Sequence, residues 1–170
     1  MNFVTFTFFY LFLVIERSIE LLISKKNEAK LRAKGAIEVY PFFNKTMMLF
    51  NLLWLMFLPL EFLNTNQTNS PLNFIIGSIL LICFQVIRYW SVYVLKEQWT
   101  VKLYKIVNPF ILTDGLYKYI KHPNYLIVVG ELIVFPLMFN CTTTLVVFVP
   151  LGVLFFYFKI KFENSLLGVR

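Results

Sequence analysis

Charged residues are scarce in this sequence. Only 15% of its 170 residues are Asp, Glu, Lys or Arg, whereas about 25% are charged in an ordinary soluble domain. Hydrophobic residues reach 59%, against roughly 45–50% in soluble domains. This balance excludes an ordinary soluble domain and indicates an integral membrane protein. Because four or five spans of about 20 residues would occupy most of the chain, any active site must lie in or beside the bilayer.

Histidine, cysteine and clustered glycine are scarce as well. The single histidine, His122, and two distant cysteines, Cys83 and Cys141, cannot supply the usual ligand cluster of zinc or iron, so no protein-built metal site is expected. We expect each cysteine to be a small buried apolar side chain. The six glycines are spread along the chain, which excludes a dinucleotide fingerprint, a Walker loop and a soluble Rossmann-type fold.

Five apolar stretches predict an all-α integral membrane protein with one domain over residues 1–170. The expected spans are about residues 2–24, 46–63, 71–95, 124–139 and 143–158. Only residues 140–142 separate the last two, which predicts a tight helical hairpin with Pro136 and Pro150 as candidate kinks. The first stretch lacks a basic leader and a cleavage site, so it is interpreted as a retained helix. Its charged residues, Glu16, Arg17 and Glu20, are interpreted as the end of that helix.

The basic residues predict the orientation in the membrane. All but two of the 16 lysines and arginines lie between spans one and two, between spans three and four, or in the tail. The opposite loops, residues 64–70 and 140–142, carry no charge. By the positive-inside rule, the N-terminus is outside and the C-terminus and any active site are cytoplasmic. The remaining two, Arg17 and Arg88, are expected to snorkel. The net charge of +7 is therefore attributed to topology rather than to nucleic-acid binding.

The segment from Trp99 to Glu131 contains the polar residues that could carry chemistry. Pro123 suits the first position of a helix, so the fourth span is expected to begin there. Its free N–H groups would then lie beside His122, Asn124 and Tyr125 and form an anion site. The alternative interpretation is that His-Pro-Asn only caps a membrane helix and that Tyr125 belongs to the interfacial aromatic belt.

Two motifs in this part of the chain are recognisable. Residues 115–125, Gly-Leu-Tyr-Lys-Tyr-Ile-Lys-His-Pro-Asn-Tyr, resemble the Gly, Tyr, Arg-His-Pro-x-Tyr signature of the isoprenylcysteine carboxyl methyltransferase family. Residues 159–166, Lys-Ile-Lys-Phe-Glu-Asn-Ser-Leu, resemble the Arg-Ile-x-x-Glu-Glu tail of that family. The resemblance covers nearly the whole chain and is closest to the small bacterial branch of alkylpyrone O-methyltransferases. Lys121 and Lys159 replace arginines of the pattern, and Asn164 replaces its second acid.

The resemblance implies a membrane enzyme that binds S-adenosylmethionine with its last two helices and the segments flanking them. Carried over by position, the residues lining the donor pocket would be His122, Pro123, Tyr125, Glu163 and Asn164. Lys159 and Glu163 are the candidate catalytic residues, and Arg88, Trp99 and Glu131 are the candidates for binding the acceptor. The bacterial branch implies an inner-membrane location and a lipophilic acceptor with an acidic oxygen, a carboxylate or an enol.

Physical reasoning on the residues agrees with this assignment. Lys159 and Glu163 are four apart and share one helical face, and the antiparallel hairpin brings them level with His122. The alternative is an ion pair that only anchors the helix end. Glu131 lies about 10 Å along the helix from Asn124, where a carboxylate requires a partner. Arg88 and Arg17 are its candidate partners, with a purely structural interhelical ion pair as the alternative.

An ionised carboxylate or enol needs no strong general base to accept a methyl group. This fits a chain with one histidine, because catalysis would then depend on the alignment of donor and acceptor. The runner-up functions are a phospholipid N-methyltransferase and an NADPH-dependent membrane reductase. A non-enzymatic membrane protein is the alternative of a different class.

Overall fold

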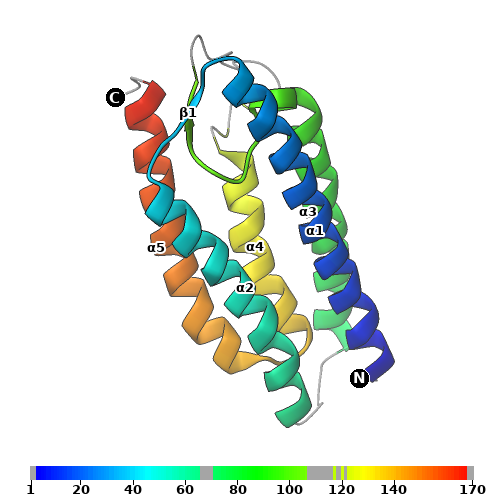
Figure 1. Ribbon diagram of the computed structural model, residues 1–170. Helices are drawn as coiled ribbons and strands as arrows, with labels where there is room; N and C mark the ends of the chain where they lie inside the picture. The colour runs from blue at the N-terminus through cyan, green and yellow to red at the C-terminus, as the bar shows by residue number, and fades with distance from the viewer. Residues whose placement is uncertain (1–2, 66–70, 107–116, 118–119, 121, 168–170) are drawn as a thin grey trace.

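The apolar stretches form helices because a helix satisfies its backbone N–H and C=O groups internally, as the bilayer core requires. The structure is a computed structural model that describes residues 3–65, 71–106, 117, 120 and 122–167. In it, five long helices each run opposite to the preceding one (Figure 1). They are α1 (Phe3–Ala33), α2 (Pro41–Asn64), α3 (Pro71–Leu95), α4 (Pro123–Met138) and α5 (Thr142–Leu167). A short 3-10 helix, η1 (Lys96–Gln98), and two strands, β1 (Ile37–Glu38) and β2 (Tyr104–Lys105), lie at one end of the bundle.

Three of these helices are long and apolar enough to cross a membrane: α2, α3 together with η1, and α5. The fold is therefore that of an all-α integral membrane protein, as the composition predicts. Helix α1 carries charged residues in its middle, and α4 has only 16 residues, which span about 24 Å against a hydrocarbon core of about 30 Å. These two helices were predicted to be spans as well, and for them this stays a prediction.

Two helices extend well beyond the spans expected for them. Helix α1 continues to Ala33, beyond the expected span end near residue 24. Glu16 and Glu20 were expected to end this helix but do not, because Arg88 of α3 pairs with both. Helix α5 continues to Leu167 instead of ending near residue 158, so Lys159 and Glu163 are held on regular helix.

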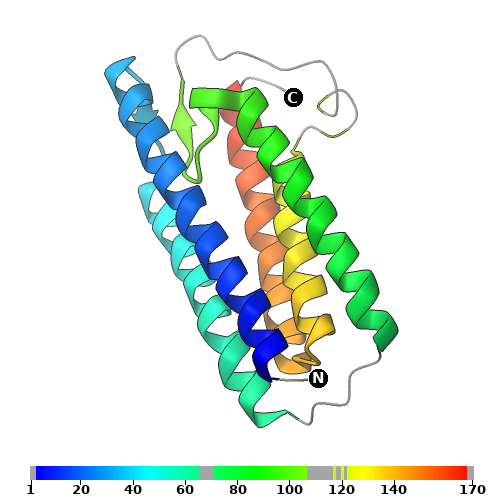
Figure 2. The same ribbon diagram turned by 90° about the vertical axis from the view of Figure 1, so that its right-hand side faces the viewer.

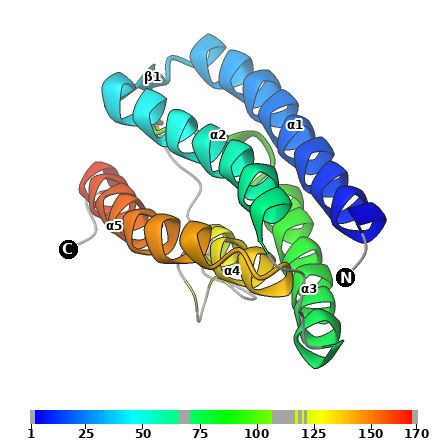
Figure 3. The ribbon, with the colours of Figure 1, turned by 90° about the horizontal axis from the view of Figure 1, so that it is seen from below.

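Helix α4 lies between α3 and α5, as the view along the bundle shows (Figure 3). Its Leu132 and Phe135 are fully buried. Two glycines allow the close approach, because a Cβ at Gly130 would overlap the ring of Phe84 on α3, and a Cβ at Gly152 on α5 would overlap Leu132. The central position of α4 fixes the place of its N-terminal residues relative to α5.

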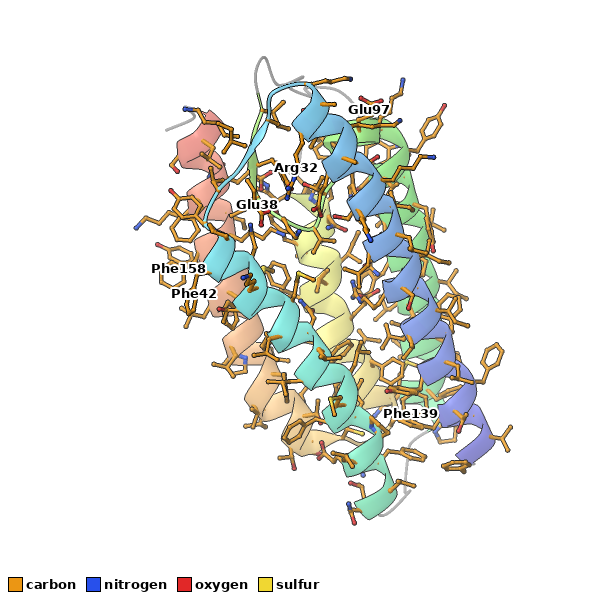
Figure 4. The ribbon with its side chains drawn as sticks, viewed as in Figure 1. Arg32, Glu38, Phe42, Glu97, Phe139 and Phe158 are labelled. Carbon is orange, nitrogen blue, oxygen red and sulfur yellow. The ribbon has the colours of Figure 1, made fainter. Side chains whose placement is uncertain are left out.

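Aromatic rings fill the end of the bundle opposite the strands. The rings of Phe6 and Phe62 stack with centroids 3.8 Å apart, and Phe139 meets Phe6 edge-on at 5.0 Å. Phe139 is fully buried at the start of the short α4–α5 connection (Figure 4). This aromatic contact fixes α1 and α2 against the closed end of the hairpin.

A carboxylate caps the first turn of α5. Glu61 near the end of α2 accepts hydrogen bonds from the backbone N–H of Thr143 at 2.6 Å and of Thr144 at 2.6 Å. The Thr144 hydroxyl donates a third, also at 2.6 Å. These bonds satisfy N–H groups that a helix start leaves free, and they join α2 to the hairpin.

The two short strands join the end of α1 to the segment that follows η1. Gly35 ends α1 with a φ of 84°, and its N–H donates to the carbonyl of Arg32 at 3.0 Å. Strand β1 then pairs antiparallel with β2, Glu38 opposite Tyr104. Figure 2 shows α1 and α2 leaning away from α4 and α5 toward this end, with β2 between them. Residues 99–105 are thereby placed beside both α1 and α5.

Both cysteines were expected to be buried. Cys141 is buried in the α4–α5 connection, but Cys83 is exposed on α3. The prediction is therefore wrong for Cys83, which lies on a face of α3 that no other described element covers.

Candidate functional site

The N-terminus of α4 meets the C-terminal part of α5. His122 is the N-cap residue of α4, and the buried Pro123 occupies its first turn. The Tyr125 hydroxyl donates a hydrogen bond to Glu163 Oε2 at 2.6 Å, and His122 Nδ1 lies 3.4 Å from the same oxygen. The rings of His122 and Tyr125 stack at 5.4 Å. The short connection between the helices explains why residues about 40 apart in sequence meet here.

Lys159 lies one turn before Glu163 and is only 4% exposed. Its Nζ donates a hydrogen bond to the carbonyl oxygen of Val101 at 2.7 Å and lies 4.8 Å from the centre of the Tyr125 ring, a cation–π contact. Tyr125 therefore contacts both Lys159 and Glu163, and among the described residues these two side chains interact through Tyr125 and at a distance rather than as a simple ion pair in direct contact.

Polar side chains of α1 hold the segment that carries Val101. Ser24 accepts a hydrogen bond from the N–H of Val101 at 2.9 Å and donates one to Glu28 at 2.9 Å. The Asn27 amide donates to the carbonyls of Lys96 and Trp99. The Val101 peptide thus joins α1 on one side to Lys159 of α5 on the other.

Sequence reasoning missed this anchoring role. Glu16, Glu20, Ser24 and Glu28 recur every four residues and are all buried, so they form a polar stripe along one face of α1. A stripe of this spacing that continues beyond an apolar stretch is a signal that could have predicted a polar interhelical contact.

Glu28 also organises the surface near the strands. Its carboxylate accepts hydrogen bonds from Lys102 Nζ at 2.8 Å and from the Tyr104 hydroxyl at 3.3 Å. The Lys102–Glu28 hydrogen bond raises the pKa of Lys102, and burial raises the pKa of Tyr104. Arg32 donates to the Tyr104 hydroxyl at 3.0 Å and to Glu38 at 2.9 Å (Figure 4).

A second polar cluster lies deeper in the bundle around Arg88. This arginine of α3 is fully buried. It forms ion pairs with Glu16 at 2.8 Å, Glu20 at 2.9 Å and Glu131 at 2.5 Å. The expectation that Arg88 snorkels to the interface is therefore wrong, because its guanidinium joins α1, α3 and α4 through three carboxylates.

Arg17 completes this cluster. It pairs with Glu20 at 2.7 Å and with Glu131, so Arg17 and Arg88 are both partners of Glu131, as predicted. With 15% of its side chain exposed, Arg17 is also not a snorkelling residue. Gln85 donates to Glu16 at 2.7 Å and to Glu131 at 3.0 Å. The cluster thus contains two cations and three carboxylates, and the roles of Arg88 and Glu131 toward an acceptor stay predictions.

The remaining predicted residues lie near these two clusters or outside the described residues. Trp99 is 3% exposed, and its indole N–H has no hydrogen-bond partner among the described residues. Asn164 follows Glu163 on α5 and is partly exposed. Lys121 and the residues from Asp114 to Leu116 lie outside the described residues.

Comparison with known proteins agrees with the motifs. Residues 76–168, which include most of α3 and all of α4 and α5, match the family model of the isoprenylcysteine carboxyl methyltransferase (ICMT) family. The chain belongs to this family. The membership confirms the resemblance inferred from the His-Pro-Asn-Tyr and Lys159–Leu166 motifs, and ICMT-family methyltransferases are membrane proteins that use S-adenosylmethionine as methyl donor. The alkylpyrone branch within the ICMT family stays a prediction.

The relatives are themselves uncharacterized. The chain is 28% identical over 159 residues to the uncharacterized protein YpbQ of Bacillus subtilis (strain 168), covering 91% of this chain and 92% of that protein. It is 34% identical over 152 residues to an uncharacterized protein of Haemophilus influenzae (strain ATCC 51907 / DSM 11121 / KW20 / Rd), covering 88% and 87%. No solved structure gives a significant match.

Proposed function

We propose that this protein transfers the methyl group of S-adenosylmethionine to an acidic oxygen of a lipophilic acceptor at the cytoplasmic interface of a bacterial inner membrane. The observation that carries the proposal is the convergence of His122, Tyr125, Lys159 and Glu163 at the open ends of α4 and α5. Membership of the ICMT family supports methyl transfer, and the chemistry of the four side chains supports the class of acceptor.

The residues at this place suit the polar end of the donor. His122 Nε2 and Asn124 Oδ1 are buried and have no hydrogen-bond partner among the described residues. Buried polar atoms of this kind normally have partners, so a ligand with an ammonium and a carboxylate group would satisfy them. The carboxylate of Glu163 would face a cationic donor favourably. His122, Asn124, Tyr125 and Glu163 are therefore the residues that we assign to donor binding, with Pro123 and Asn164 beside them.

When bound, S-adenosylmethionine supplies an electrophilic methyl group. The protein's own residues orient the charged groups of the site and exclude water from it. The hydrogen bond from Tyr125 and the contact with His122 orient the Glu163 carboxylate. Lys159 is oriented by the Val101 carbonyl and the Tyr125 ring, and its ammonium group would hold the anionic oxygen of the acceptor. Because this oxygen is already ionised, positioning accounts for the catalysis and no proton needs to be removed.

Calorimetry combined with a transfer assay tests the proposal. Glu163→Gln should weaken S-adenosylmethionine binding, because it removes the carboxylate but keeps the size of the side chain. Lys159→Met should leave donor binding intact and abolish methylation of extracted lipids. The matched control is Lys161→Met, because Lys161 lies two residues away on the same helix and is exposed. Unchanged donor binding in a Glu163→Gln, His122→Ala double variant would contradict the proposal, and binding of NADPH instead would favour a reductase.

The proposed orientation has its own test. The strand end of the bundle carries the basic segments, so we infer that it faces the cytoplasm. A Lys105→Cys variant in intact cells should react with a membrane-impermeant thiol reagent only after the membrane is opened. The wild-type chain, with Cys83 and Cys141, gives the background, and labelling of Lys105→Cys in intact cells would reverse the orientation.

A further inference from the structure

A groove of about 500 Å³ opens between α1 and α2, on the strand side of the bundle. Its apolar lining comes from Leu21 and Ala29 of α1, Met48 of α2 and Val101. Because α1 runs toward the strands, Leu21 lies farther from them than the polar lining residues of this helix do. The groove therefore grades from a polar end near the strands to an apolar end nearer the bilayer centre.

The polar end of the groove is predominantly basic. It contains Lys25, Arg32 and Lys102 against one carboxylate, Glu28. Lys102 and Arg32 already have carboxylate partners, Glu28 at 2.8 Å and Glu38 at 2.9 Å. Lys25 forms no ion pair within the described part of the chain, and its side chain is exposed at the groove. An anion bound in the groove can therefore pair with the ammonium group of Lys25 and with the exposed sides of Arg32 and Lys102.

The wall of the groove separates it from the candidate active site. Val101 lines the groove, and its carbonyl binds Lys159, which is not a lining residue. Its N–H is held by Ser24, so this peptide is fixed from both sides. An occupant of the groove would touch Val101 without reaching Tyr125 or Glu163. This placement fits a resident molecule better than a molecule that reacts at Lys159.

We propose that the groove binds an anionic glycerophospholipid of the surrounding bilayer, with its phosphate at Lys25, Arg32 and Lys102 and an acyl chain along Leu21 and Met48. Basic pockets between membrane helices on the cytoplasmic side suit anionic head groups, and the apolar end of the groove suits a hydrocarbon chain. The lipid lies between α1 and α2 at the strand end of the bundle, whereas the Phe6–Phe62 stack holds these two helices together at the other end.

Native mass spectrometry of the purified full chain in detergent tests this binding. The protein is mixed with dioleoyl phosphatidylglycerol or with dioleoyl phosphatidylcholine at equal concentration. The wild type should retain phosphatidylglycerol in preference. Lys25→Glu should lower its association constant relative to Lys26→Glu, because Lys26 is the adjacent exposed lysine but does not line the groove. Reversing one charge near an anionic head group corresponds to roughly a thirtyfold loss, and the matched control has the same net charge.

A second pair of variants tests the shape of the site without changing charge. Ala29→Trp fills the groove and should abolish selective retention, whereas Leu22→Trp changes an exposed residue outside it and should leave retention unchanged. Equal retention in Lys25→Glu and Lys26→Glu, or in both tryptophan variants, would overturn the proposal.

Two further outcomes would also overturn it. Full displacement of phosphatidylglycerol by glycerol 3-phosphate would mean that the site recognises a phosphate alone. Conversion of the bound lipid to a methylated product on addition of S-adenosylmethionine would mean that the groove holds the acceptor.

Discussion

The buried cluster around Arg88 allows a sharp test of how charge is balanced inside this bundle. Replacing Arg88 by Met keeps an unbranched apolar stem but removes a fully buried guanidinium that pairs with three carboxylates. Arg17 would then be the remaining cation of the cluster against Glu16, Glu20 and Glu131. Leaving buried charges without their partner destabilises a protein by about 3–5 kcal/mol. At about 2–4 °C per kcal/mol for a chain of this size, Tm should fall by roughly 6–20 °C.

The partner variant Glu131→Gln should behave differently, although Glu131 touches Arg88 directly. The wild-type cluster has two arginines and three carboxylates, so loss of one carboxylate leaves equal numbers of both signs. The glutamine can also keep the hydrogen bond with Gln85. We therefore expect a much smaller fall in Tm than for Arg88→Met, and a partial recovery when Glu131→Gln is added to Arg88→Met.

Thermal unfolding in detergent micelles measures these differences. Arg32→Met is the control, because Arg32 also pairs with a glutamate but is half exposed, and it should leave Tm unchanged. Equal falls in Tm for Arg88→Met and Glu131→Gln would refute the charge-balance argument. Equal Tm values for Arg88→Met and Arg32→Met would refute the idea that the cluster stabilises the bundle at all. Methylation by the Glu131→Gln variant, if it folds as expected, then tests the predicted acceptor role of Glu131 separately from stability.

Three further predictions concern the supports of the site. Glu61→Ala removes the cap of α5 and should lower Tm by about 2–8 °C, as expected for a loss of about 1–2 kcal/mol. The pKa of Lys102 is raised above its ordinary value of 10.5, so its stabilising contribution is complete below pH 10.5 and is lost as the pH rises through the folded pKa. The Tm difference between wild type and Lys102→Met should therefore be constant below that pH and shrink above it. Gly130→Val should lower the yield of folded protein and its Tm, because the added side chain would overlap a ring of α3.

Several features of the site follow from local patterns in the sequence. The apolar stretches predict the helices, and Pro123 predicts where α4 begins, because its ring suits the first turn. The three-residue connection between α4 and α5 restricts the two helices to an antiparallel pair, so the nearness of His122 and Glu163 could be predicted from spacing alone. The pairing of Glu131 with Arg17 and Arg88 could be predicted because a carboxylate in the membrane requires cations.

Other features depend on contacts between distant segments and were missed. Glu16 and Glu20 look like the end of a membrane helix, yet they lie inside it, because Arg88 on another helix neutralises them. Val101 has no polar side chain to draw attention to it, and its role comes from a backbone peptide held between Ser24 and Lys159.

The sequence by itself determined that this is an all-α membrane protein of the ICMT family. It also determined that the basic residues gather at one set of helix ends. These properties depend on composition, spacing and short connections, all of which are local. The tertiary structure decided how the charges pair, what holds Lys159 and where a groove remains between α1 and α2. Those outcomes depend on which helix faces meet, since a carboxylate or a peptide group acquires its role only from the group that folding brings beside it.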